Sequence, residues 1–439
     1  MRALLLCSLL LVGCGATLVD HLDLTAAPPP PGGCPQTVNA CGPTCGACPA
    51  PSANGTASCD SVNNTCVFAC QRGYLRCGDA SCCRAAEVAA GGDSTCAVVD
   101  NRTVRCWGAP LGSNAPPSPV PALVAGLAAV NTVALGSSHA CAILSSGSVR
   151  CWGDNSAGQL GHPASGPSPT PLDPVPGVSG ATALSLGDRH SCASTASGVL
   201  CWGANELGQL GDGSQDPAIG VVSVAFASHT DPFGGGPHPI AAGLNHTCAV
   251  LTSGVACWGA NESGQIGNGG GPAPQPTPAA VQFSGGAVGA LAVGAGQRHS
   301  CALLASSTLD CWGQGTLGQL GDGSSTNQKT PRHVVLTNPT VIAAGRAHTC
   351  AAAGSGSQLF CWGANDSGQL GTGDKVSQPR PSTSATPLLD IRTLAAGTDH
   401  ACALQAAGPL LCWGRNDRGQ VGIDSANAPV PTPTLVSAP

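Results

Sequence analysis

Short apolar stretches separated by glycine and polar residues run through most of the chain, and from about residue 86 they follow a fixed pattern. Each stretch ends in a glycine, and a cysteine follows five positions later, in seven copies. The first copy has Val88 to Gly91 before Cys96, and the second has Val133 to Gly136 before Cys141. Units of variable length that keep this spacing constant indicate two strands held in register across a tight turn. The pattern therefore predicts repeated antiparallel β-structure.

A second motif, Cys-Trp-Gly, also occurs seven times and contains every tryptophan of the protein. Neighbouring tryptophans are 45 to 56 residues apart, and seven such units reach the end of the chain. A third motif, Asn-x-x-Gly-Gln-Leu-Gly, follows most of them, as in residues 205–211, but residues 109–112 of the first unit have lost most of it. Proline-rich stretches such as Ser168 to Pro171 then indicate surface loops that lead to an outer edge strand. We therefore expect an all-β fold, a seven-bladed β-propeller over residues 86–439.

The two cysteines of each unit are 9 to 11 residues apart, and we expect one disulfide per blade. In a hairpin with a three-residue loop, Cys141 lies opposite Cys151, and opposed Cα atoms lie ~4.5–5.5 Å apart, within the range of a disulfide. Each bond would add ~2–3 kcal/mol to the free energy of unfolding. The alternative is that these cysteines are buried free thiols. The expected pairs are Cys96 with Cys106, Cys141 with Cys151, Cys192 with Cys201, Cys248 with Cys257, Cys301 with Cys311, Cys350 with Cys361, and Cys402 with Cys412.

The tryptophan beside the second cysteine points to the opposite face of its strand, because side chains alternate along a strand. One indole per blade, burying ~150–250 Å², can fill the space between neighbouring blades. Only 3% of the residues are aromatic, so the tryptophans are expected to supply the main volume of the core. They are Trp107, Trp152, Trp202, Trp258, Trp312, Trp362 and Trp413.

A histidine precedes the first cysteine by two residues in six units, at His139, His190, His246, His299, His348 and His400. A metal site is one interpretation, but each blade would supply three ligands without a fourth, and the first unit has Ser94 instead. We expect a structural histidine that bonds to a neighbouring loop. No metal, cofactor or catalytic residue is assigned, and the protein is not expected to be an enzyme.

The N-terminal part predicts export. One basic residue and an apolar run end at Leu-Val-Gly-Cys, and the run is shorter than the ~20 residues of a membrane span. The sequence resembles a bacterial lipoprotein signal, with residues 1–13 removed, Cys14 lipidated, and 14–33 a proline-rich tether. An ordinary signal cut near Ala16 is the alternative. Residues 34–85 carry ten cysteines and are expected to form a small disulfide-rich module.

Charge and composition exclude one class of partner. Charged residues make up 9% of the chain, the net charge is −6, and no basic run is present. The chain therefore lacks the cluster of basic residues that binding to nucleic-acid phosphates requires.

The Trp-Gly, Gly-Gln-Leu-Gly and Gly-x-x-His motifs together resemble the regulator of chromosome condensation repeat family over about residues 86–439. The resemblance implies a seven-bladed propeller. The nuclear founder's nucleotide exchange activity is not expected here, because the chain has an export signal and no basic face. Similarity to exported bacterial relatives implies protein binding through loops on one face. A cysteine pair in each blade departs from the nuclear pattern and fits an extracytoplasmic setting.

Three functions remain open. The first is a monomeric binding or scaffolding protein, held in the cell envelope by a lipid anchor, in the periplasm or at the outer-membrane surface, that binds a protein through propeller loops. The insertion at residues 213–239 is the expected distinctive contact. The second is a lectin-like propeller that binds carbohydrate or envelope polymer, for which only Phe226 and Phe233 offer aromatic surface. The third is an enzyme on the axial face.

Overall fold

The computed structural model describes residues 54–60, 65–71, 73–76, 81–217, 220–226, 239–286, 289–355, 357–423 and 428–436. These residues fall into two compact units, one with residues 57–68 and the other with residues 54–56 and 69–436. The expected signal, Cys14 and the tether lie outside the described residues. Every regular element in the described part is a β-strand, so this part contains no helix able to cross a membrane.

Seven antiparallel sheets, the blades of a propeller, make up most of the second unit. Blade 1 contains β5 (Ala85–Gly91), β6 (Ser94–Val99), β7 (Val104–Gly108) and β8 (Ser118–Leu123). Blade 2 contains β9 (Val130–Leu135), β10 (His139–Leu144) and β11 (Val149–Gly153). Blade 3 contains β12 (Ala183–Leu186), β13 (His190–Thr195), β14 (Gly198–Gly203) and β15 (Val222–Ser223). Blade 4 contains β16 (Ile240–Ala242), β17 (His246–Leu251), β18 (Gly254–Gly259) and β19 (Gln275–Ala280).

The last three blades have the same order of strands. Blade 5 contains β20 (Ala290–Ala295), β21 (His299–Leu304), β22 (Leu309–Gly313) and β23 (Gln328–Val334). Blade 6 contains β24 (Pro339–Ala344), β25 (His348–Ala353), β26 (Gln358–Gly363) and β27 (Gln378–Thr383). Blade 7 contains β28 (Ile391–Ala396), β29 (His400–Gln405), β30 (Leu410–Gly414) and β31 (Val430–Leu435).

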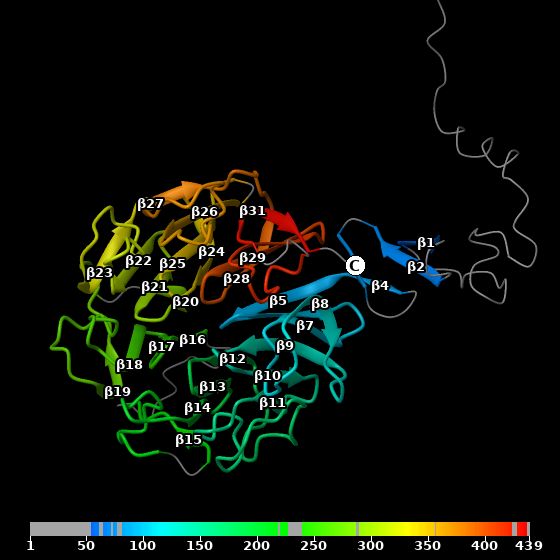
Figure 1. The fold of residues 1–439 in the computed structure, drawn as a ribbon. Helices are drawn as coiled ribbons and strands as arrows, with labels where there is room; N and C mark the ends of the chain where they lie inside the picture. The colour runs from blue at the N-terminus through cyan, green and yellow to red at the C-terminus, as the bar shows by residue number, and fades with distance from the viewer. Residues whose placement is uncertain are drawn as a thin grey trace, which may run out of the picture. The chain divides into compact units, whose positions relative to one another are not determined.

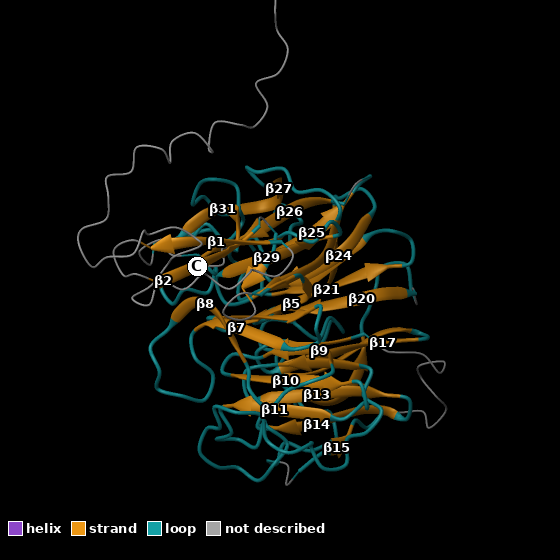
Figure 2. Ribbon diagram, turned by 90° about the vertical axis from the view of Figure 1, so that its right-hand side faces the viewer, coloured by secondary structure: helices purple, strands orange, loops and turns teal. Residues whose placement is uncertain are grey.

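The blades close into a ring around the first strand of each sheet. These inner strands contact one another in the order β5, β9, β12, β16, β20, β24 and β28, and β28 contacts β5 again (Figure 1). Each blade then runs outward from the axis in chain order (Figure 1), and Figure 2 shows the ring from its side. The predicted all-β, seven-bladed propeller is therefore confirmed.

Blade 2 differs from the expectation for its outer edge. Its sheet has three strands, and the proline-rich stretch expected to lead to an outer strand makes one isolated bridge, between Ser168 and Gly153. The stretch Ser168 to Pro171 contains two prolines, and each removes a backbone donor that a ladder needs. Proline-containing edge strands do form in blade 1 and in blades 4 to 7, so proline alone does not prevent pairing here.

The core lies between the blades, as the position of the indoles predicts. Trp202 of blade 3 packs with Cys141, Val149 and Leu160 of blade 2, and all four are buried. At the closure of the ring, Trp107 of blade 1 packs in one cluster with buried residues of blade 7. Burial of ~150–250 Å² at ~25 cal/mol per Å² corresponds to an upper estimate of ~4–6 kcal/mol per indole.

The backbone conformation and its close packing explain why a glycine ends each Cys-Trp-Gly motif. Gly153 has a φ of 112°, and a Cβ at this position would lie 2.5 Å from the Ser138 carbonyl oxygen. Any other residue would therefore clash with the neighbouring turn.

Short strands precede blade 1. β1 (Gly55–Asp60) pairs with β2 (Thr65–Cys70), and β3 (Leu75–Arg76) pairs with β4 (Cys82–Cys83). A disulfide joins Cys70 to Cys82, and Leu75 is buried in one cluster with Val88 and Leu404 of the propeller. The other pairings of the cysteine-rich segment involve residues outside the described part.

Candidate functional site

Every blade contains its own disulfide, in the expected pairing. The bonds join the second and third strands of each blade, with Cα atoms 4.0–4.1 Å apart. All fourteen cysteines except Cys106 are fully buried. The two central strands of a blade therefore cannot separate without unfolding or reduction, which makes each blade a rigid support for its loops.

Neighbouring blades are joined by a hydrogen-bonded contact that we call the clasp. Between blades 3 and 4, the Nε2 atom of His190 lies 2.9 Å from the Thr247 Oγ1 atom. That hydroxyl donates to the Gln209 carbonyl oxygen at 3.1 Å, and the indole Nε1 of Trp258 donates to the same oxygen at 3.0 Å. One blade thus supplies the histidine and the glutamine carbonyl, and the next supplies the hydroxyl and the indole.

Four further interfaces contain the complete clasp. The hydroxyls that meet the histidines are Ser191, Ser300, Thr349 and Thr95, at 2.8–2.9 Å from Nε2. The expected hydrogen bond of the histidines is therefore present, but its partner lies on a strand of the next blade rather than in a loop. In the sequence the hydroxyl residue directly follows the histidine of the next repeat, or Ser94 in the first repeat, and only the closed ring brings it to the histidine of the preceding blade.

Burial keeps these histidines neutral. Each is fully buried, and this burial lowers the histidine pKa from 6.5 to about 4 at His139 and His348, and to about 3 at the four others. The described residues contain no group of three or more His, Cys, Asp or Glu side chains placed to bind a metal. These histidines act as structural residues of the ring.

Two interfaces depart from the clasp. Between blades 6 and 7, Ala401 replaces the hydroxyl, and neither ring nitrogen of the buried His348 has a hydrogen-bond partner. Trp413 still donates to the Gln369 carbonyl oxygen there, at 2.9 Å. Between blades 1 and 2, Ser94 replaces the histidine, Ala140 replaces the hydroxyl, and the loop after Trp107 lacks the glutamine.

One end of the ring concentrates charge, and we call it the charged face. It consists of the turns between the first and second strands of the blades and of the first five residues after each Cys-Trp-Gly motif. Its charged residues are Asp93, Asp154, Asp188, Arg189, Glu206, Glu262, Arg298, Arg346, Asp366, Asp399, Arg415, Asp417 and Arg418. At the opposite end, the described turns between the second and third strands consist of Ala, Asn, Ser, Thr, Gly and Pro apart from Asp100 and Arg102 of blade 1. Arg84 and Asp390 also lie at this end, where each bonds to the turn of blade 7 at residues 406–407.

An axial cavity of about 300 Å³ lies among the inner strands of the seven blades. Apolar residues such as Val133, Leu186 and Ile342 line its wall, and Asp188 and Arg346 of the charged face are its charged lining residues. Backbone hydrogen bonds join the turns of neighbouring blades near its mouth, for example from Asp188 N–H to the Leu244 carbonyl at 3.0 Å.

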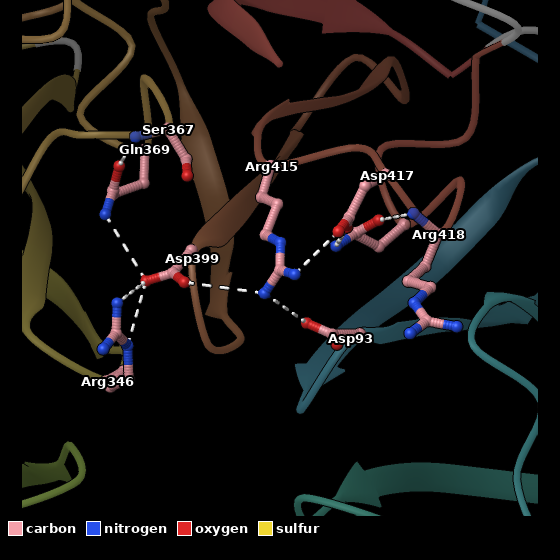
Figure 3. A network of polar contacts seen from close by, with 9 residues as sticks. Asp93, Arg346, Ser367, Gln369, Asp399, Arg415, Asp417 and Arg418 are labelled. Carbon is pink, nitrogen blue, oxygen red and sulfur yellow. Dashed lines mark hydrogen bonds and ion pairs between the residues drawn. The ribbon is translucent and has the colours of Figure 1, made fainter. Parts of the chain in front are cut away.

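Ion pairs on the charged face cross the closure of the ring. Arg346 of blade 6 contacts Asp399 of blade 7 at 2.8 Å, and Arg415 lies 3.9 Å from Asp399 and 3.7 Å from Asp93 of blade 1. Figure 3 shows Asp399 between the two arginines, and Arg415 also contacting Asp417 at 2.6 Å. Burial raises the pKa of Asp93, and the charge of Arg415 opposes that rise. This network links blades 6, 7 and 1 where the clasp between blades 6 and 7 is incomplete.

Two other ion pairs are more exposed. Arg298 contacts Glu262 at 3.5 Å and Arg189 contacts Glu206 at 3.9 Å, with all four side chains 43–57% exposed. Exposed pairs of this kind contribute ~0–1 kcal/mol to stability. The concentration of charge on one face is therefore not explained by the stability of the fold.

The expected contact at residues 213–239 lies partly outside the described residues, including Phe233. Phe226 is described, and its ring packs edge to face on Trp258 with centroids 5.9 Å apart. It fills the space beside the core, which weakens the lectin-like interpretation. The charged face was missed from the sequence, although the charge at the positions after Gly and after Trp-Gly could have indicated it.

The comparisons with known proteins agree with the architecture. Two models described as "Regulator of chromosome condensation (RCC1) repeat" match the chain, and together they cover residues 130–209 and 240–420, more than half of it. The ultraviolet-B receptor UVR8 of Arabidopsis thaliana is 33% identical over 188 residues, which are 42% of this chain and 42% of that protein. The X-linked retinitis pigmentosa GTPase regulator homolog of Caenorhabditis elegans is 34% identical over 128 residues, 28% of this chain and 9% of that protein. The matches thus span less than half the length of these relatives.

Solved structures share the fold. Human WBSCR16 aligns with a TM-score of 0.64 and 22% identity, over 75% of this chain and 89% of that one. Yeast RCC1 (Prp20), in a crystal structure with Kap60, aligns with a TM-score of 0.64 and 21% identity, over 76% of this chain and 83% of that one. With its repeats, clasps and ring closure, the chain belongs to the family of propellers built from regulator of chromosome condensation (RCC1) repeats.

Proposed function

We propose that the protein is a binding or scaffolding protein that contacts a protein partner through the charged face. The observation that carries the proposal is the gathering of charged, mostly exposed side chains at one end of a ring whose opposite turns contain fewer charged residues. Charged side chains contribute little to stability when exposed, but they steer association and select among partners.

The rigidity of the ring supports this role. A disulfide in every blade and a clasp at five of the seven interfaces hold the strands that carry the turns of the charged face, so little conformational entropy is lost when a partner binds there. Protein binding is also a property of relatives: yeast RCC1 (Prp20) was crystallised bound to Kap60, and a structure of Prp20p was described with its binding to Gsp1p and histones. Binding of proteins by this propeller fold supports the same class of function here.

The proposed location is the cell envelope, with Cys14 as the lipid anchor and no enzymatic activity. Seven buried disulfides support an oxidising compartment, because thiols are kept reduced in the cytosol. Mass spectrometry of the exported protein tests this part. A Cys14 without acyl chains, or a chain that keeps residues 1–13, would contradict it.

Charge reversal on the charged face tests the binding role. The full chain, produced through an export pathway, is cross-linked in the cells that produce it, as wild type and as Glu206→Lys/Glu262→Lys/Arg298→Glu. The control Asp100→Lys/Asp173→Lys/Arg332→Glu changes the net charge equally at exposed positions outside the charged face. We expect one cross-linked partner for the wild type and the control, and its loss in the first variant. A partner kept by both variants, or lost equally from both, would contradict the proposal.

A further inference from the structure

A pocket of about 320 Å³ lies between blades 1 and 2 on the charged face, and it is open to solvent. We call it the seam pocket. Blade 1 supplies Ser94 and residues 109–114, and the blade 2 side supplies Ser137, Ser138, Asp154 and Pro167.

The seam pocket arises where the repeat is incomplete. In blade 3 the loop after the tryptophan is filled by its own side chains: Asn205 Oδ1 accepts from the Leu210 N–H at 3.0 Å, and Gln209 Oε1 accepts from the Leu207 N–H at 2.9 Å. Blade 1 has neither the asparagine nor the glutamine, and the Ser94 hydroxyl donates to the Ala109 carbonyl at 2.7 Å instead. The volume that these side chains occupy elsewhere is therefore open between the first two blades.

One carboxylate sets the charge of the seam pocket. Asp154 is the only charged residue among those that line it, and the corresponding residues of the other repeats are Ala109, Ala204, Ala260, Gln314, Ala364 and Arg415. Its Oδ2 atom accepts from the Ser156 hydroxyl at 2.8 Å and from the Gln159 amide at 2.6 Å. The Oδ1 atom accepts only the Ser156 N–H, at 3.2 Å, which leaves an acceptor position for a further donor.

The remaining walls fit a long basic side chain and the backbone that carries it. Pro110 and Leu111 are half-buried and present an apolar surface, against which the methylene stem of a lysine or arginine packs. Ser137, Ser138 and Asn114 are exposed at the edge, where their side chains can bond to a peptide backbone. A volume near the lower end of the range of small-molecule sites has room for one such side chain.

We propose that the seam pocket binds a lysine or arginine side chain presented by an extended segment of a partner protein, with Asp154 as its counter-ion. The proposal rests on the proposed protein-binding function and names the chemistry of the partner. A charge-assisted hydrogen bond to Asp154 would supply the selectivity, and the clasp that closes the corresponding space at five other interfaces is absent here.

Defined peptide pools test the proposal. The probes are three pools of fluorescent pentapeptides, Xaa-Xaa-Z-Xaa-Xaa, in which Z is lysine, arginine or norleucine and Xaa is randomised among uncharged residues. Binding to the oxidised full chain is measured by fluorescence anisotropy at low salt. We expect the lysine and arginine pools to bind about tenfold more tightly than the norleucine pool, the size of one charge-assisted contact.

Two variants and a control locate the effect. Asp154→Asn removes the charge while retaining an acceptor for the Ser156 N–H. It should lower the affinity for the lysine pool to that for the norleucine pool. Ser138→Arg places a guanidinium at the exposed edge and should have the same effect. Asp100→Asn removes an exposed carboxylate from the opposite end of the ring and should leave the binding of all three pools unchanged.

Equal binding of the lysine and norleucine pools, or an Asp154→Asn variant that binds like the wild type, would overturn the proposal. Competition by n-butylammonium at the concentration of the lysine pool would also overturn it, because the pocket would then take small cations rather than a peptide segment. Either result leaves the charge-reversal test of the charged face unaffected, so failure of the seam pocket is distinguishable from failure of the proposed function.

Discussion

Completing the clasp between blades 6 and 7 should stabilise the protein. His348 is fully buried there, and its Nε2 atom has no hydrogen-bond partner because Ala401 occupies the position of the hydroxyl. Its Nδ1 atom has no partner either, as in the other five buried histidines. Ala401→Ser would place an Oγ atom between the His348 ring and the Gln369 carbonyl oxygen. Ser300 shows that serine fits this setting, since it meets His246 at 2.9 Å and donates to the Gln265 carbonyl at 3.0 Å.

The magnitude follows from two hydrogen bonds. Each typically contributes ~0.5–1.5 kcal/mol, and one of them satisfies a buried nitrogen that now has no partner. Fixing the new hydroxyl offsets part of this gain, so we expect the free energy of unfolding to rise by about 1–2 kcal/mol. The reverse change, Ser300→Ala, removes both bonds and leaves His246 Nε2 unpaired, and it should cost about 1–3 kcal/mol.

Chemical denaturation of the oxidised full chain, followed by tryptophan fluorescence, measures both changes. Ala140→Ser is the matched control: it adds the same hydroxyl between blades 1 and 2, where neither the histidine nor the glutamine carbonyl is present. This control should gain nothing. If Ala401→Ser and Ala140→Ser shift stability equally, or if Ser300→Ala has no effect, the clasp does not stabilise the ring as argued.

Three further predictions concern pH and the disulfides. The six buried histidines have folded-state pKa values of about 3 to 4, below the ordinary 6.5, so the unfolded chain takes up protons more readily than the folded one. The free energy of unfolding should therefore be at its full value above pH 6.5 and fall as the pH drops from 6.5 toward 4. Urea unfolding at pH 7 and pH 5 should show this loss, and a flat profile would refute it. Burial raises the pKa of Glu87 from 4.5 to about 7, against its bond to Thr132, so this group lowers stability as the pH rises from 4.5 through 7; Glu87→Gln should gain up to about 3 kcal/mol over the wild type at pH 8.5 and little at pH 4.5, and equal gains at both would contradict the assignment. Replacing the buried Cys301–Cys311 pair by alanines should lower the free energy of unfolding by about 2–3 kcal/mol in calorimetry, with no loss expected if the bond were strained rather than stabilising.

Much of the fold could be predicted because the residues of each repeat determine the local geometry of their own blade. The constant spacing from Gly136 to Cys141, and the hairpin between Cys141 and Cys151, depend on contacts within one blade. The same local reasoning predicts the disulfides and the side of the strand on which Trp152 lies. These features need no knowledge of how the blades are arranged.

Features between blades could not be predicted in this way. The partner of His190 is Thr247, 57 residues away on the next blade, and no spacing within one repeat indicates that contact. The seam pocket likewise depends on residues of two blades: blade 1 lacks the asparagine and the glutamine of the repeat, and blade 2 supplies the carboxylate of Asp154. The position of Asp154 after Trp-Gly is a usable signal only once the loops are known to lie on one face.

The central claim is that the charged face is where a partner binds. Hydrogen–deuterium exchange on the full chain, alone and with the partner found by cross-linking, tests this most directly. We expect slower exchange in peptides that cover the turns at residues 92–94, 187–190 and 397–400, and unchanged exchange in the opposite turns at 145–147 and 305–308. Protection confined to the opposite turns would show that the partner binds the other end of the ring.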